Sequence, residues 1–166
     1  MLYQAAVFIH ILSAIVWAGG MLFLVMVMVP LARQAMRDGG PGAVLLQQAA
    51  RRFLPVAWSA IALLVLTGIY IAWSHWGVRP DNFFTGGGQF IRVLQIKVGL
   101  TLLVIVLSLA HDFVIGPLVL RKLEATPSPG DAGYPRRGRA LVLVLARMNL
   151  LLVMAILVLA VVLVRP

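Results

Sequence analysis

The chain has 166 residues, 62% of them apolar, and its 14 basic side chains outnumber 5 acidic ones to give a net charge of +9. Soluble domains carry a much larger share of charged residues, so this composition excludes one and indicates an integral membrane protein. No cysteine is present, which excludes disulfides and thiolate metal sites and leaves nitrogen, oxygen or thioether sulfur as metal ligands.

Four apolar stretches are long enough to cross about 30 Å of hydrocarbon as helices, a span that takes about 20 residues. They predict helices at about 2–31, 53–76, 90–120 and 140–164. The first helix is predicted to end near Pro30, and a glycine-rich break follows at 38–42. Residues 43–52 are predicted to lead helically into the second helix, which has Pro55 in its first turns. The predicted fold is all-α: a single transmembrane domain, 1–166, folded as an integral membrane four-helix up-down bundle.

Basic side chains are concentrated in two of the three predicted loops. The first loop carries Arg33, Arg37, Arg51 and Arg52, and the third carries Arg121, Lys122, Arg136, Arg137 and Arg139. Because basic loops stay on the cytoplasmic side, this pattern predicts a multi-pass protein of the cell inner (plasma) membrane with both termini outside. Anionic membrane lipid, and no nucleic acid, is the predicted partner of these loops.

His10 and Lys97 are ionisable residues inside predicted membrane spans, where such groups are energetically costly and usually functional. At a rise of 1.5 Å per residue, His10 lies about 10 Å from the middle of its helix and Lys97 about 12 Å from the middle of its own, both toward the outside. We therefore expect the two side chains to face one cavity. His111 lies about 9 Å toward the cytoplasm, too far from His10 to share one metal ion with it.

Small and polar residues form one stripe on the first predicted helix and one on the third, and such stripes face other helices in membrane proteins. The first stripe is Ala6, His10, Ser13, Trp17 and Gly20, and the second is Lys97, Thr101, Val104, Ser108 and His111. On the fourth predicted helix, Arg147 is expected to pair with Asp112 or with a ligand carboxylate.

A cavity with imidazole and amine nitrogens, aliphatic walls and a guanidinium suits haem b, whose iron takes axial nitrogens and whose propionates pair with basic groups. Lysine ligates iron only when neutral, and burial in a low dielectric favours that form. The residues predicted to bind the cofactor are His10, Lys97, Trp17, Thr101, His111 and Arg147, with His10 and Lys97 as the metal ligands.

Other interpretations of these residues stay open. Lys97 can instead extend its amine to the outer interface, and His75 then replaces it as the second ligand, reaching inward from an aromatic belt that includes Trp73 and Trp76. His111 can be a structural hydrogen-bonding group. Methionines in the first helix can ligate copper, but they do not share one helical face and are interpreted as apolar filler.

Several short motifs resemble two groups of small membrane proteins, the copper-resistance D (CopD-like) membrane domain and the HemJ-type protoporphyrinogen oxidases. The motifs are His10-Ile-Leu-Ser-Ala-Ile-Val-Trp17-Ala-Gly19-Gly20, Arg51-Arg52-Phe53, Pro55 with Gly68, Lys97 with its aliphatic run to His111, and Arg147-Met148-Asn149-Leu150-Leu151. The resemblance extends over nearly the whole chain. The resemblance to the HemJ-type proteins implies that His10 and Lys97 bind or contact haem b.

The leading hypothesis is a haem b-binding, cytochrome b-like membrane protein that passes electrons between a quinone or a periplasmic redox protein and an acceptor, as a membrane oxidoreductase would. The alternative is copper binding or copper transport across the membrane. Protoporphyrinogen oxidation and a structural role in a larger membrane complex are further alternatives, and a homo-oligomer is left open. A hydrolase is excluded, because the sequence offers no Ser-His-acid set.

Overall fold

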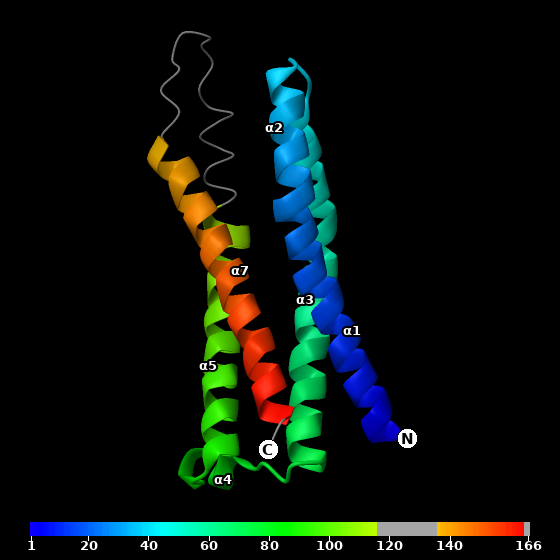
Figure 1. Ribbon diagram of the computed structural model, residues 1–166, viewed down its shortest axis with the longest axis vertical. Helices are drawn as coiled ribbons and strands as arrows, with labels where there is room; N and C mark the ends of the chain where they lie inside the picture. Colours follow the sequence, from blue (N-terminus) through cyan, green and yellow to red (C-terminus); the bar gives the residue numbers. More distant parts are fainter. Residues whose placement is uncertain (116–135, 165–166) are drawn as a thin grey trace. The chain divides into compact units, whose positions relative to one another are not determined.

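The computed structural model describes residues 1–115 and 136–164, and helices are the only regular secondary structure in these two ranges (Figure 1). Three of the helical stretches are long and apolar enough to cross a membrane, and the shorter apolar segment Arg147–Leu163 follows them. The three stretches are Leu2–Arg37, Gly42–Ser74 and Gln89–Val114. The prediction of an all-helical fold with helices long and apolar enough to cross a membrane is confirmed for this part of the chain, whereas the up-down bundle and the location of the termini stay predictions.

The chain divides into two compact units, Met1–Thr85 and Gly86–Pro166. In the first unit, α1 (Leu2–Phe23), a π-helical turn η1 (Leu24–Met28) and α2 (Val29–Arg37) follow one another without a break. The long helix α3 (Gly42–Ser74) returns antiparallel to them and packs along all three (Figure 1). The first unit is therefore a helical hairpin.

Close contacts at glycines fix the register of this hairpin. A Cβ atom added at Gly20 of α1 would overlap the ring of Phe53 on α3, and one added at Gly42 would overlap the backbone carbonyl of Ala32. Helices approach closely in membranes where a small residue lies at the contact. Only glycine fits at these two positions without a shift of the neighbouring group.

The predicted break after the first helix is confirmed. Helix α2 ends at Arg37 and not near Pro30, and Gly39 has the positive φ of 77° that glycine adopts readily after a helix. The amide of Gly40 donates to the carbonyl of Ala35 at 2.8 Å and closes the turn. Because α3 begins at Gly42, the residues before Arg52 are helical as expected, but Pro55 lies inside α3 and not in its first turns.

A short helix, α4 (Pro80–Thr85), follows α3. Asn82 holds the connection between them, since its side-chain oxygen accepts from the amide of Arg79 at 2.7 Å and its nitrogen donates to the carbonyl of Gly77 at 2.9 Å. These bonds satisfy backbone groups that the end of a helix leaves without intrahelical partners.

The second unit contains α5 (Gln89–Leu109), a π-helical turn η2 (Ala110–Ile115) and α7 (Arg136–Val164). Helix α5 packs against α7, and Val104 and Val153 are the largest completely buried side chains among the described residues. Asn149 of α7 donates to the hydroxyl of Ser108 on α5 at 3.2 Å. The end of the predicted third helix (116–120) and the basic residues Arg121 and Lys122 lie outside the described residues.

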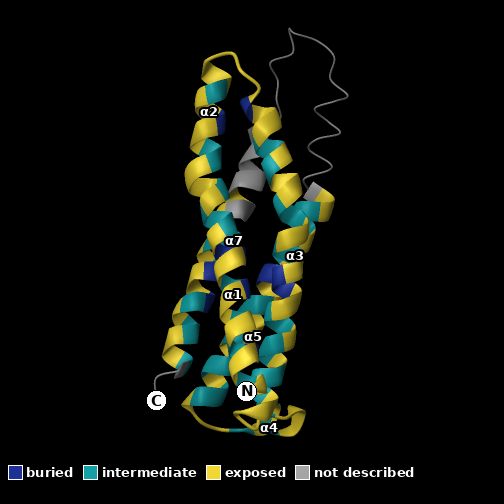
Figure 2. Cartoon of the chain, turned by 90° about the vertical axis from the view of Figure 1, so that its right-hand side faces the viewer, coloured by how far each residue is buried: buried dark blue, intermediate teal, exposed yellow. Residues whose placement is uncertain are grey.

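Exposed and half-buried residues cover most of every described helix, and buried residues occupy short stretches of them (Figure 2). Large apolar side chains are among the exposed ones in both units, for example Phe8, Leu66 and Val106. An exposed apolar surface of this extent is unusual in a soluble monomer and fits contact with membrane lipid.

Candidate functional site

The imidazole of His10 is held by a residue of the facing helix. Its Nδ1 atom lies 2.8 Å from the hydroxyl oxygen of Thr67, which is 57 residues further along the chain on α3. The hydroxyl hydrogen of Thr67 is donated to the carbonyl of Leu63, one turn earlier in the same helix. A threonine hydroxyl has a single hydrogen, so with that hydrogen directed at Leu63 the hydroxyl oxygen presents lone pairs to His10 Nδ1.

The ring of His10 also lies against the backbone of α3. A Cβ atom added at Gly68 would lie 3.3 Å from Cε1 of His10 and 3.8 Å from its Nδ1. The first distance is shorter than an ordinary van der Waals contact, so the ring approaches as closely as it does because residue 68 is a glycine. Thr67 and Gly68 together determine where the imidazole lies.

His75 lies at the far end of α3 among aromatic rings, as its predicted position in a belt implies. It stacks on Tyr3 with ring centroids 4.2 Å apart and planes 22° apart, and it meets Trp76 edge to face at 5.1 Å. Tyr3 precedes His10 by seven residues, which is about 10 Å along a helix. The structure therefore does not bring the imidazoles of His75 and His10 together.

The predicted polar stripe of the first helix is its packed face. Ala6, Ser13 and Trp17 are buried, and Trp17 is only 7% exposed. An open groove of about 380 Å³ runs along α1 and α3 beside this face. Its lining residues are Leu12, Ser13 and Val16 from α1 and Pro55, Val56, Ser59, Ala60 and Leu63 from α3.

In the second unit, the stripe predicted on the third helix contains the buried residues of α5, Val104 and Ser108. Lys97 is half-buried, and its backbone carbonyl accepts the hydroxyl of Thr101 at 2.8 Å. This bond stays within one helix. Since His10 lies in the first unit and Lys97 in the second, their shared cavity stays a prediction.

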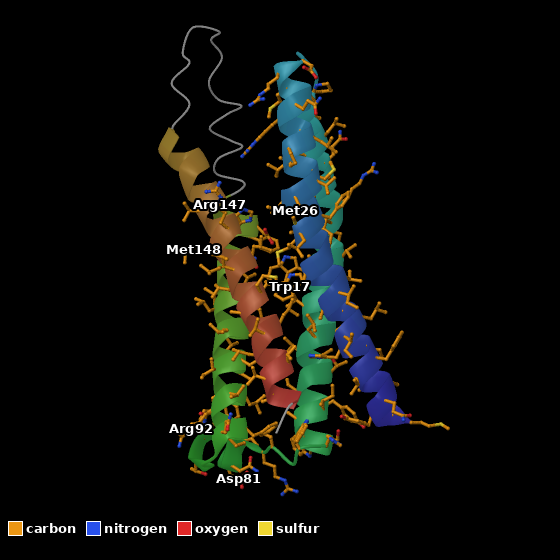
Figure 3. All side chains as sticks on the ribbon, in the orientation of Figure 1. Trp17, Met26, Asp81, Arg92, Arg147 and Met148 are labelled. Atoms are coloured by element: carbon orange, nitrogen blue, oxygen red, sulfur yellow. The ribbon has the colours of Figure 1, made fainter. Side chains whose placement is uncertain are left out.

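His111 lies in η2, where its Nδ1 atom is 2.9 Å from the carboxylate oxygen of Asp112, the next residue. Arg147 of α7 is exposed, and it lies one residue before Met148 on that helix (Figure 3). The predicted pairing of Arg147 with Asp112 stays a prediction. Within residues 1–115 and 136–164, no group of three or more His, Asp or Glu side chains could hold a metal ion.

Thr67 was not among the predicted site residues, although every histidine was considered for the site. The only local signal is a hydroxyl next to a glycine in an otherwise apolar run. Which residue of α3 faces His10 depends on the register of the hairpin, and that register depends on contacts such as the one between Gly20 and Phe53.

Comparison with known proteins gives one family. The sequence model of the family described as copper resistance protein D matches residues 47–163, which is well over half of the chain. The matched range includes Lys97, Thr101, His111 and Arg147, whereas His10 and Trp17 precede it. No curated protein and no solved structure matches the chain.

Proposed function

Because the chain belongs to the copper resistance protein D family, we propose that it binds copper among its membrane helices and carries the ion across the membrane. The family match over residues 47–163 is the observation that carries this proposal. Copper is the cargo in this proposal. The alternative of copper binding or transport is thereby preferred to the leading hypothesis of a haem protein.

The side chains of the first unit have suitable chemistry for copper. A chain without cysteine has imidazole nitrogen and thioether sulfur as its softer donors, and these suit copper(I). His10 supplies the first. Met21, Met26 and Met28, interpreted from the sequence as apolar filler, supply the second in this proposal. They lie further along the same helical rod, where Met26, labelled in Figure 3, is 69% exposed.

The spacing of these donors favours transport over storage. Met21 follows His10 by 11 residues and Met28 follows it by 18, distances of about 16 Å and about 27 Å along a helix. An ion is conducted when its successive sites bind it strongly enough to admit it and weakly enough to release it. Separate sites that each offer the ion few donors meet that condition better than one closed cluster of donors does. Met26 and Met28 also lie in the π-helical turn η1, a distortion frequent at functional sites.

Haem b binding stays a prediction of the sequence. It requires nitrogens from His10 and Lys97 at one iron, and the two residues belong to different units. Roles for a quinone or a periplasmic redox protein depend on the same haem and stay predictions with it. The copper proposal requires no such pairing, because His10 is already oriented by Thr67 within one unit.

The proposal is tested on the full chain purified in detergent and then placed in lipid vesicles. We expect copper(I) to bind in a titration against a competing chelator, and to enter vesicles that contain a trapped copper(I) indicator. We also expect copper without iron by elemental analysis. A protein purified with stoichiometric iron and a Soret band that shifts on reduction would overturn the proposal and restore haem b as the cofactor.

A further inference from the structure

We propose that Thr67 and Gly68 are positioning residues for His10, which select the ring nitrogen that carries the lone pair and set its direction. Its consequence for copper binding rests on the function proposed above. The geometry on which it is based does not depend on copper.

The hydrogen bonds of Thr67 form a chain with a single direction. The hydroxyl of Thr67 lies closer to the carbonyl of Leu63 than to that of Leu64, which is 3.4 Å away, so Leu63 is the main acceptor of its hydrogen. Back-bonding of this kind is common for threonine within a helix. The hydroxyl oxygen then has only lone pairs for His10, and the 2.8 Å contact requires a hydrogen on Nδ1.

Gly68 sets the direction of the ring around this bond. Cε1, which lies between the two ring nitrogens, is the atom of His10 closest to a Cβ added at residue 68. A methyl group there would push on this edge of the ring while Nδ1 is bound to Thr67. The expected consequence of Gly68→Ala is a rotated ring with a redirected Nε2 atom, and not the loss of the hydrogen bond alone.

Thr67 and Gly68 orient His10 as the hydrogen-bond partner of a metal-binding histidine does. A metal-binding histidine usually donates its other N–H to a carboxylate, a carbonyl or a water molecule, and this bond fixes the tautomer and the ring orientation. Here a threonine hydroxyl accepts that hydrogen. A neutral acceptor suits a membrane span, because a carboxylate there would add a buried charge.

The first experiment measures the tautomer without metal. The full chain is labelled with ¹⁵N in its histidine rings, and the His10 signal is identified among the three histidines by its loss in His10→Gln. We expect a protonated Nδ1 and an unprotonated Nε2 in the wild type and in Thr67→Ser, and a shift toward the other tautomer in Thr67→Val. A wild-type ring protonated on Nε2 alone, or a Thr67→Val ring like that of the wild type, would overturn the proposal.

The second experiment measures copper(I) affinity in the same variants. Loss of the group that hydrogen-bonds to a metal ligand typically weakens metal affinity by about 10- to 100-fold. We expect a loss of this size in Thr67→Val and recovery of the affinity in Thr67→Ser. The matched control is Thr85→Val, which removes a similar hydroxyl bond in the short helix α4, to the carbonyl of Asp81 four residues earlier. Where His10→Gln weakens copper(I) binding, equal affinity of Thr67→Val and the wild type would contradict the positioning role.

The two experiments separate the two proposals. If the expected tautomer is found and His10→Gln binds copper like the wild type, Thr67 positions His10 and the copper role assigned to His10 is wrong. If copper binding needs His10 and the ring carries its hydrogen on Nε2, the copper role stands and the positioning proposal is wrong. Helix content measured by circular dichroism shows that each variant has folded before either result is used.

Discussion

The two units hold their histidines in different ways. In the first unit, His10 bonds to Thr67 on another helix, 57 residues away in the chain. In the second unit, the partner of His111 is Asp112, its own neighbour. A contact across helices exists only when the helices are packed in the correct register, whereas a contact between neighbours requires only the local turn. The orientation of His10 is thus a property of the folded hairpin.

The largest expected effect tests which histidine binds copper. We expect His10→Ala to reduce copper uptake into vesicles by at least about 10- to 100-fold, the loss typical when only the hydrogen-bond partner of a metal ligand is removed, because this variant removes the proposed ligand itself. His111→Ala should change uptake much less, because the ring it removes is paired to Asp112 in the same turn and is not one of the proposed copper donors. Equal losses in the two variants would show that the copper path is not confined to the first unit.

The next largest effect concerns the packing that brings Thr67 to His10. Gly20→Ala places a methyl group where the ring of Phe53 lies, and overpacking of this kind destabilises by about 1–3 kcal/mol. Gly19→Ala is a matched control one residue away, since a Cβ atom there would have nothing within 4 Å. It should be neutral or stabilise by up to about 1 kcal/mol, because alanine favours a helix.

Unfolding of the detergent-solubilised protein in increasing SDS, followed by circular dichroism, measures both glycine variants. The hairpin register predicts that Gly20→Ala also weakens the bond between His10 and Thr67, which the ¹⁵N signal of His10 reports. Equal stabilities of the two variants would contradict the close approach of α1 and α3 at Gly20.

The packed faces were predictable because a helical stripe is a local pattern. The stripes of Ala6, Ser13 and Trp17 on α1 and of Val104 and Ser108 on α5 follow from a period of 3.6 residues, and these residues are buried. The π-helical turns η1 and η2 do not change this result, because each follows the stretch that contains those buried residues.

The partner of His10 was not predictable from the same pattern. A shift of α3 by one turn along α1 would keep the stripe of α1 packed and would present a different side chain to His10. The steric limits at Gly20 and Gly42 select one register, and these contacts join residues far apart in the sequence. Pro55 was misplaced for a related reason, since the predicted helix began at residue 53 and α3 begins at Gly42.

A smaller effect sharpens the comparison in the second unit. Asn149 and Ser108 form a hydrogen bond between α7 and α5, and such bonds in membrane proteins average about 0.6 kcal/mol. A double-mutant cycle of Ser108→Ala and Asn149→Leu should give a coupling energy of about this size in SDS unfolding. The same cycle on Thr101→Val and Asn149→Leu should give none, since the Thr101 hydroxyl bonds to the carbonyl of Lys97 in its own helix.

The smallest expected effect on copper uptake distinguishes His75 from His10 within the same hairpin. Tyr3 stacks on His75 near one end of α3, and aromatic pairs of this kind contribute about 0.5–1.5 kcal/mol beyond their buried area. Tyr3→Leu should therefore lower stability by no more than this, with Tyr3→Phe as the control that keeps the ring. Copper uptake should be unchanged in both variants, because the Tyr3 stack lies about 10 Å along α1 from His10. A loss of uptake in Tyr3→Leu that Tyr3→Phe restores would place His75 on the copper path, and would make the aromatic end of the hairpin part of the site.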